Sequence, residues 1–447
     1  MSRFRWRLFW TLALLNVLAV SAVLVISTRW PEGWSNASPT PSTNLDPVVE
    51  VVPTTAAAAA TPTAESTPVA PQPARPPDAT TVELWHSWSG SEGDALTNIL
   101  SRFQQLRPDI RVQSHFVAYG DFAQAYTEAA RAGGGPDLIM APGWWLRQLA
   151  AEDLLLPLDT WVPAQERAQF IPATVENLTW RGRLYGLPTH YELVALYFNR
   201  RLLADDSLPA TTDDIIDLAQ ASPSQGIGIY TNFYHLFWAI PAYGSALFDE
   251  NGRVVLDQST GTAQFLSWLL RAQETPGIFT ALDYGMLMER FKKEEYALFI
   301  DGPWSIRELR ERFGDDLGVA PLPDGPGGPA RPWLGADGVF LNAAVPDERR
   351  EHALALARHI TGADSASQLA QIAGRLPAHK DADLGGDALL TGFSFQADTA
   401  LALPHHAEMD EVWGYAEEMI AQALDRAATP EEAVVQAATL INEANEK

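Results

Sequence analysis

Tryptophans that directly follow expected strands are the residues most suited to holding a small molecule. Trp88 comes shortly after the alternating stretch 81–85, and Trp144 and Trp145 come shortly after the apolar stretch 137–140. Both stretches read as strands. In open α/β sheets, ligands bind beyond the carboxyl ends of the strands. These three indoles are therefore candidate ligand platforms.

Acidic and imidazole side chains suggest two further kinds of chemistry. Glu192 and Asp337 could act as the acid and base of a glycosidase, which pairs two carboxyl groups with aromatic platforms. His405, His406 and Glu408 cluster in the sequence, and a helix would set His405 and Glu408 on one face as metal ligands. Two ligands make a weak metal site, and the P-loop, H-E-x-x-H and G-x-S-x-G motifs are absent. We therefore expect no enzyme activity, no metal and no cofactor.

The elements that would position these residues alternate between strand and helix. After the first strand, Leu96, Ile99, Leu100 and Phe103 share one helical face. A strand is expected from residue 110, a helix over 121–131 and a strand over 137–140. This alternation predicts right-handed crossovers and a mainly parallel sheet in an α/β fold. Further expected elements are a buried strand at 296–300 and helices at 262–272, 347–361, 364–374, 407–425 and 430–445.

The N-terminal residues indicate a membrane segment. Arg3, Arg5 and Arg7 precede an uncharged apolar run, 8–26, which as a helix would span roughly 28 Å. The arginines favour the cytoplasmic side, so the rest of the chain is expected outside. A signal peptide cleaved near Ala22 is the alternative. We expect residues 1–30 to be an anchor or signal segment.

Composition separates the next segment from the remainder of the chain. Residues 31–79 are rich in Pro, Thr and Ala and have few large apolar side chains, which predicts a disordered linker before a folded region at 80–447. The chain has no cysteine, which excludes disulfides and thiolate metal sites. Its net charge of −25 argues against a nucleic-acid partner.

Several short motifs, in this order and spacing, carry a family resemblance. They are Gly135-Pro-Asp137, Tyr185-Gly-Leu-Pro188 with Tyr197-Phe-Asn199, Asp301-Gly-Pro-Trp304, Trp333-Leu-Gly335 leading to Gly338, Arg375-Leu-Pro377, and Pro404 leading to Trp413. From about residue 81 to the C-terminus, the chain resembles family 1 of the extracellular solute-binding proteins. This family comprises the maltose-binding-protein-like sugar-binding components of ABC importers.

The resemblance implies a two-lobed, periplasmic-binding-protein-like clamp of type II that closes on its ligand by hinge motion. Lobe one would hold residues 80–192 and 340–378, and lobe two residues 193–339 and 379–447. Hinges would lie near 191–195 and 336–340. Many members of the family are held by an acylated cysteine. This chain has none, so its attachment would differ.

The resemblance also implies a ligand site. Sugars need aromatic platforms for their apolar faces and polar groups for their hydroxyls. The expected site residues are Trp88, Ser89, Trp144, Trp145, Glu192, Asn232, Tyr234, Trp304, Asp337 and Trp413, with Glu192 and Asp337 as hydrogen-bond acceptors. An anionic ligand would need convergent arginines, and only Arg147, Arg331 and Arg375 are near. A neutral mono- or oligosaccharide is therefore the expected ligand.

The expected setting is the extracytoplasmic face of the membrane, with the protein tethered by its N-terminal helix or secreted if that helix is cleaved. Separate ABC permease subunits would supply the pore, and separate subunits the energy. The protein is expected to be a monomer. A ligand sensor without a transport role, or a carbohydrate-active enzyme, is the alternative.

Overall fold

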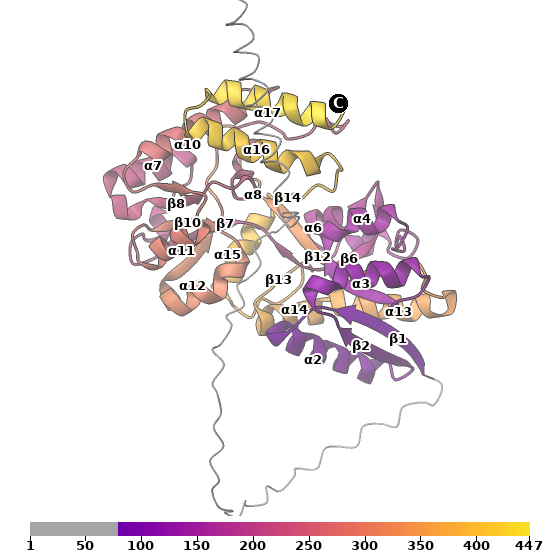
Figure 1. Cartoon of the computed structure of the whole chain (residues 1–447). Helices are drawn as coiled ribbons and strands as arrows, with labels where there is room; N and C mark the ends of the chain where they lie inside the picture. Colours follow the sequence, from indigo (N-terminus) through magenta and orange to yellow (C-terminus); the bar gives the residue numbers. More distant parts are fainter. Residues whose placement is uncertain (1–78) are drawn as a thin grey trace, which may run out of the picture. The chain divides into compact units, whose positions relative to one another are not determined.

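This computed structural model describes residues 79–447, which form two mixed β-sheets with flanking helices (Figure 1). The expected anchor or signal segment at 1–30 lies outside the described residues, as does the expected linker at 31–79 apart from its last residue. Within 79–447, no helix combines the length and the apolar character needed to cross a membrane.

The larger sheet has the strand order β13-β6-β12-β3-β1-β2, with β14 paired to β12. Its strands are β1 (Thr80–His86), β2 (Ile110–Phe116), β3 (Leu138–Pro142), β6 (Gly186–Glu192), β12 (Trp333–Leu341), β13 (Leu376–Pro377) and β14 (Leu401–Ala402). Strands β1, β2 and β3 are parallel, as predicted. Strand β12 is antiparallel to both β3 and β6, so the sheet as a whole is mixed.

Amphipathic helices bury their apolar faces on this sheet. In α2 (Gly90–Leu106), the residues predicted to share a face, Leu96, Ile99, Leu100 and Phe103, are all buried. The other elements of this part are α3 (Tyr119–Arg131), η1 (Gly143–Trp145), α4 (Leu146–Ala151), α5 (Ala164–Arg167), α6 (Pro172–Asn177), α13 (Asp347–Thr361), α14 (Ala363–Ala373) and the β4 (Thr179–Trp180)–β5 (Arg183–Leu184) pair. Helix α14 ends at Gly374, whose φ of 66° suits a glycine.

The smaller sheet has the order β11-β7-β10-β8-β9. Its strands are β7 (Ala195–Asn199), β8 (Ile227–Tyr230), β9 (Phe279–Ala281), β10 (Leu298–Asp301) and β11 (Leu317–Ala320). Its helices are α7 (Thr212–Ala221), α8 (Phe233–Leu236), α9 (Ala239–Ala242), α10 (Gly261–Glu274), α11 (Tyr284–Lys292), α12 (Ile306–Phe313), α15 (Ala388–Ala397), α16 (Met409–Leu424) and α17 (Pro430–Ala444). Short 3-10 turns are η2 (Asp205–Ser207), η3 (Pro223–Gln225), η4 (Pro303–Ser305) and η5 (Gly314–Asp316).

The two faces of the smaller sheet pack into different hydrophobic clusters. Along β7, Leu196 and Phe198 join the cluster that includes side chains of α7, α10, α16 and α17. Ala195 and Tyr197 point the other way, into the cluster that also contains the core of the larger sheet. Figure 1 shows α16 and α17 beside α10. The smaller sheet is therefore covered on both faces.

The chain passes between the sheets twice along its central part. The first passage is the two-residue link between Glu192 and Ala195, inside the expected hinge at 191–195. The second lies between Ala320, the last residue of β11, and Trp333, the first residue of β12. The predicted hinge at 336–340 falls inside β12, which pairs with β3 and β6. Residues 333–339, expected in lobe two, thus lie in a strand of the larger sheet.

Candidate ligand-binding site

A group of charged side chains lies at the carboxyl end of β6, around Arg375. The Arg375 guanidinium donates from Nη1 to Glu192 Oε1 at 2.9 Å and from Nε to Glu92 Oε1 at 2.7 Å. Glu192 is the last residue of β6, Arg375 directly precedes β13, and Glu92 lies in the first turn of α2. Three elements distant in sequence therefore hold the expected acceptor Glu192 in place.

Asp337 adds a third carboxyl group to this region. It lies in β12 opposite His190 of β6, with 3.7 Å between Asp337 Oδ2 and His190 Nε2. Burial, together with the charge of Glu192, raises the Asp337 pKa to about 8. Burial also holds the His190 pKa well below its usual value. The lowered pKa of His190 disfavours its charged form, so the contact is not a full ion pair.

An aromatic group gathers three of the expected site residues, Tyr234, Trp304 and Trp413, around Trp333. Tyr234 lies with its ring centre 6.4 Å from those of Trp304 and of Trp333, and Trp333 lies 5.4 Å from Trp413. Burial raises the Tyr234 pKa above its usual value, and the charge of Glu192 adds to this effect. Trp333 also lies in β12, two residues before Gly335, which pairs with Glu192. Strand β12 therefore connects the aromatic group to the carboxyl groups of Glu192 and Asp337.

The strand end before Trp304 is organised by a buried carboxylate. Asp301 is fully buried and accepts hydrogen bonds from Ser305 Oγ at 2.6 Å and from the Tyr284 hydroxyl at 2.7 Å. A Cβ at residue 302 would collide with the Trp304 indole, so glycine is required there. These contacts explain the Asp-Gly-Pro-Trp motif: the aspartate and glycine fix the turn that presents the tryptophan.

Trp145 meets an aromatic residue that the sequence analysis did not identify. The Tyr119 ring centre lies 5.7 Å from that of Trp145. Burial raises the Tyr119 pKa to about 12, assisted by the charges of Asp337 and Glu192. Tyr119 follows β2 at its carboxyl end, the same signal that pointed to the tryptophans. It therefore belongs with the site.

The other expected site residues serve local structure in part. Trp88 is only 7% exposed, and its ring packs edge-on against His190. Ser89 is the exposed N-cap residue of α2, and its side chain forms no capping bond. Asn232 caps α8 by accepting a hydrogen bond from the backbone N–H of His235, and it donates to Glu417. A ligand would have to compete for the Asn232 amide.

The structure argues against the metal alternative. His405 precedes α16 and donates from Nε2 to the Asn177 carbonyl at 2.5 Å, whereas Glu408 is the N-cap of that helix and pairs with Lys447 at 3.0 Å. His406 packs against Phe248. The expectation that His405 and Glu408 share a helical face is therefore wrong. Across residues 79–447, no three histidine or acidic side chains are arranged to hold a metal ion.

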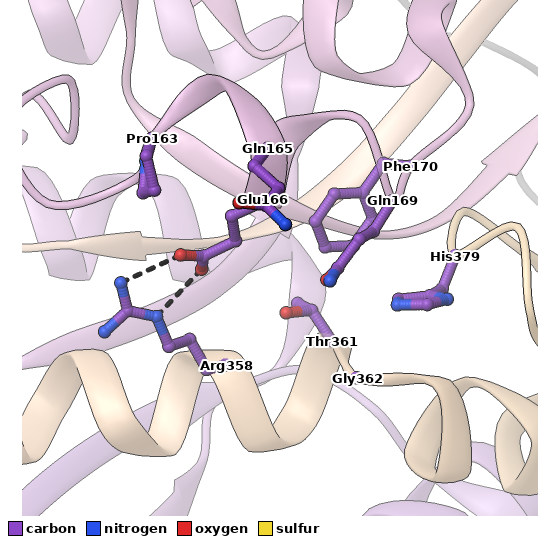
Figure 2. Close-up of a pocket in the computed structure, with 9 residues that line it drawn as sticks. All are labelled: Pro163, Gln165, Glu166, Gln169, Phe170, Arg358, Thr361, Gly362 and His379. Atoms are coloured by element: carbon purple, nitrogen blue, oxygen red, sulfur yellow. Dashed lines mark hydrogen bonds and ion pairs between the residues drawn. The ribbon is translucent and has the colours of Figure 1, made fainter.

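A pocket of about 340 Å³ lies elsewhere, between the 163–170 segment and the end of α13 (Figure 2). Its lining residues are Pro163, Gln165, Glu166, Gln169, Phe170, Arg358, Thr361, Gly362 and His379. Glu166 and Arg358 form an ion pair across it, with 2.8 Å between Oε1 and Nε. None of the expected site residues lines this pocket.

Comparison with known proteins identifies the family. The model of the bacterial extracellular solute-binding protein family matches residues 87–366. The chain belongs to this family. This solute-binding protein is similar in sequence to the maltotriose-binding protein of Pyrococcus abyssi. The two are 24% identical over 347 residues, which cover 74% of this chain and 75% of the relative. It is also similar to the galactooligosaccharide-binding protein of Bacillus subtilis, with 23% identity, covering 79% and 87%.

Solved structures match the solute-binding protein in fold. A cyclo/maltodextrin-binding protein in complex with maltotetraose superposes with a TM-score of 0.73 at 25% identity, covering 82% of this chain and 97% of the other. The fold is therefore the expected α/β fold of the two-lobed, maltose-binding-protein-like structures. The relatives named here are binding proteins, so they lend no support to the glycosidase alternative.

Proposed function

We propose that this solute-binding protein captures a neutral mono- or oligosaccharide for an ABC importer. The observation that carries the proposal is that Trp333, packed against Tyr234 and Trp413, lies in the same strand as Asp337, two residues before the one that pairs with Glu192. Aromatic rings can stack on the apolar faces of a sugar, and carboxyl groups can form hydrogen bonds with its hydroxyls. The named relatives bind maltotriose, maltodextrins and galactooligosaccharides, which supports a sugar as the ligand.

The arginines near the site support a neutral ligand. Arg147 pairs with Asp410 at 2.8 Å, and Arg375 is held by Glu92 and Glu192. Arg331 donates from Nε to the Thr399 carbonyl at 3.2 Å. A phosphate or carboxylate ligand needs guanidinium groups that are free to bind it. Each of these three is already engaged, so a glycerophosphate-like ligand is disfavoured.

The proposed mechanism is closure of two lobes about the links between the sheets. Contacts made only in the closed state shift the population toward it, and a shift from 1:99 to 99:1 needs about 5.5 kcal/mol of differential affinity.

We further propose that all ten expected site residues contact the ligand. The protein would act as a monomer without enzymatic activity, outside the cytoplasmic membrane, and deliver its sugar to separate permease subunits.

A thermal-shift and calorimetric screen of the purified full-length protein tests this function. Maltotriose, galactooligosaccharides and glycerol 3-phosphate are the ligands to compare. A sugar at a hundred times its dissociation constant should add about 2.7 kcal/mol of stability and be recovered unchanged. Stabilisation by glycerol 3-phosphate alone would contradict the neutral-ligand proposal, and hydrolysis of the bound sugar would favour the glycosidase.

A further inference from the structure

Two carboxyl groups bond to one guanidinium at the carboxyl end of β6, and a third carboxyl group, that of Asp337, belongs to the same region. Arg375 bonds to Glu92 and Glu192, while the Asp337 carboxyl makes no contact with it. Within residues 79–447, His190 is the one basic side chain in contact with the Asp337 carboxyl, and His190 is buried and neutral. Asp337 is thus the member of the group without a cationic partner.

Apart from Arg375, the groups that act electrostatically on Asp337 bring it no positive charge. Glu192 comes from β6 and Glu92 from α2, and both disfavour the ionised form of Asp337. The hydroxyl of Tyr119, in α3, adds no charge either, because its pKa of about 12 keeps it protonated up to strongly alkaline pH. Arg375 is the only cation acting on Asp337 among these neighbours, and its charge is divided among the three carboxyl groups. Burial therefore dominates, and the Asp337 pKa rises to about 8.

We propose that Asp337 keeps its proton at neutral pH and donates an O–H hydrogen bond to an oxygen of the bound sugar, so that binding weakens in alkaline solution. This inference rests on the proposed function. It also reverses the role that the sequence analysis gave Asp337, from acceptor to donor. The Asp337 side chain is 28% exposed, so a ligand can reach it.

The neighbouring Glu192 makes this assignment chemically useful. An ionised carboxylate only accepts hydrogen bonds, whereas a protonated carboxyl group can also donate one. Glu192 is held by Arg375 as an acceptor. A sugar hydroxyl could therefore donate to Glu192 while its oxygen accepts from Asp337. An amide at position 337 would also be able to donate, through its NH₂ group, but would not titrate.

Calorimetric titration of the full-length protein with maltotriose between pH 6 and pH 9.5 tests the proposal. The wild-type dissociation constant should not change with pH below pH 7. It should be about tenfold larger at pH 9 than at pH 7, as linkage to one proton requires. In Asp337→Asn, the ratio of the two constants should fall to about one, whatever the absolute affinity. Asp364→Asn, an exposed aspartate on α14, should keep the wild-type ratio.

A second measurement needs no sugar. The ¹³C signal of the Asp337 carboxyl, identified by its loss in Asp337→Asn, should titrate with a midpoint near pH 8. A midpoint near pH 4, or a flat wild-type affinity profile with intact binding at pH 7, would overturn the donor assignment and leave sugar binding standing. Lack of maltotriose binding at every pH would count against the sugar-binding proposal. In that case the carboxyl titration still tests Asp337 by itself, and a midpoint near pH 4 would show that Asp337 is ionised at neutral pH.

Discussion

Arg147 of α4 and Asp410 of α16 form an ion pair, although 263 residues separate them. Arg147 Nη2 lies 2.8 Å from Asp410 Oδ2 and 2.9 Å from Oδ1. Helix α4 follows η1, which carries Trp144 and Trp145, and α16 carries Trp413. The ion pair therefore ties together two elements that carry expected ligand platforms.

Removing this ion pair should affect ligand affinity more than folding stability. Both side chains are more than a third exposed, and such pairs contribute about 0.2–1 kcal/mol. If the pair belongs to the ligand-bound arrangement, Arg147→Ala should weaken maltotriose binding by up to about fivefold, measured by calorimetry. Arg271→Ala removes an exposed ion pair within the smaller-sheet part and is the matched control. Equal effects of the two variants would contradict a link to the ligand site.

Loss of an aromatic platform should weaken sugar binding without unfolding the protein. In Trp304→Ala, we expect maltotriose affinity to fall at least tenfold, because the sugar can no longer stack on the indole and the apolar contact area of the indole is lost. Trp161→Ala is the control, since Trp161 is also partly buried but lies away from the site. Wild-type affinity in Trp304→Ala, with fluorescence titration as the readout, would remove Trp304 from the site.

A buried asparagine holds the turn before β3. Asn342 is 2% exposed, and its Nδ2 donates to the carbonyls of Gly134 and Pro136, both at 2.9 Å. Asn342→Ala leaves these carbonyls without their donor, so unfolding in urea should show a loss of about 2–4 kcal/mol. Asn98→Ala, in the exposed face of α2, should change stability little. A loss below 0.5 kcal/mol for Asn342→Ala would show that water replaces the amide.

Stability should fall as the solution is acidified below about pH 6.5. Burial is the main cause of lowered pKa values at five histidines, namely His86, His190, His359, His379 and His405. The unfolded chain takes up protons near pH 6.5, where the folded protein does not, so folding is favoured above that pH and penalised below it. Each histidine that stays neutral contributes up to about 1.4 kcal/mol per pH unit.

Urea unfolding at pH 7.5, 6.5 and 5.5 measures this slope. His190→Gln should make it shallower by about 1.4 kcal/mol per pH unit, because His190 has the most strongly lowered pKa of the five. His406→Gln, at an exposed position, should keep the wild-type slope. A slope unaltered by His190→Gln would mean that His190 is protonated in the folded protein.

Local patterns in the sequence predicted most of the elements. The helical face of Leu96, Ile99 and Phe103 is buried as expected, and the helix predicted at 347–361 has those bounds. The direction of β12 was not predictable, because strand pairing depends on contacts far apart in sequence. For the same reason, the place of residues 333–339 in the larger sheet could not be predicted from the sequence. Pro142 opposite Asp337 in the observed register is a contact that no local pattern records.

The sequence predicted which residues are candidates for the site better than it predicted the hydrogen bonds and ion pairs between them. Strand-end position and motif resemblance pointed to Trp304 and Glu192, and the structure places Trp304 beside Tyr234 and pairs Glu192 with Gly335 of β12. Sequence reasoning missed the role of Arg375 in holding Glu92 and Glu192, since a bond across 283 residues leaves no local trace. The same rule that selected Trp144 would have selected Tyr119, had it been applied to β2.

The place of β12 in the larger sheet has a consequence for how the chain is made. β12 lies between β6 and β3 but is the strand formed by residues 333–341. During synthesis from the N-terminus, β3 and β6 emerge long before the strand that joins them. Unpaired strand edges favour misassociation, and long-range pairing slows folding. The larger sheet can close only after about three-quarters of the chain has emerged, so the nascent protein depends on delayed folding or on chaperones.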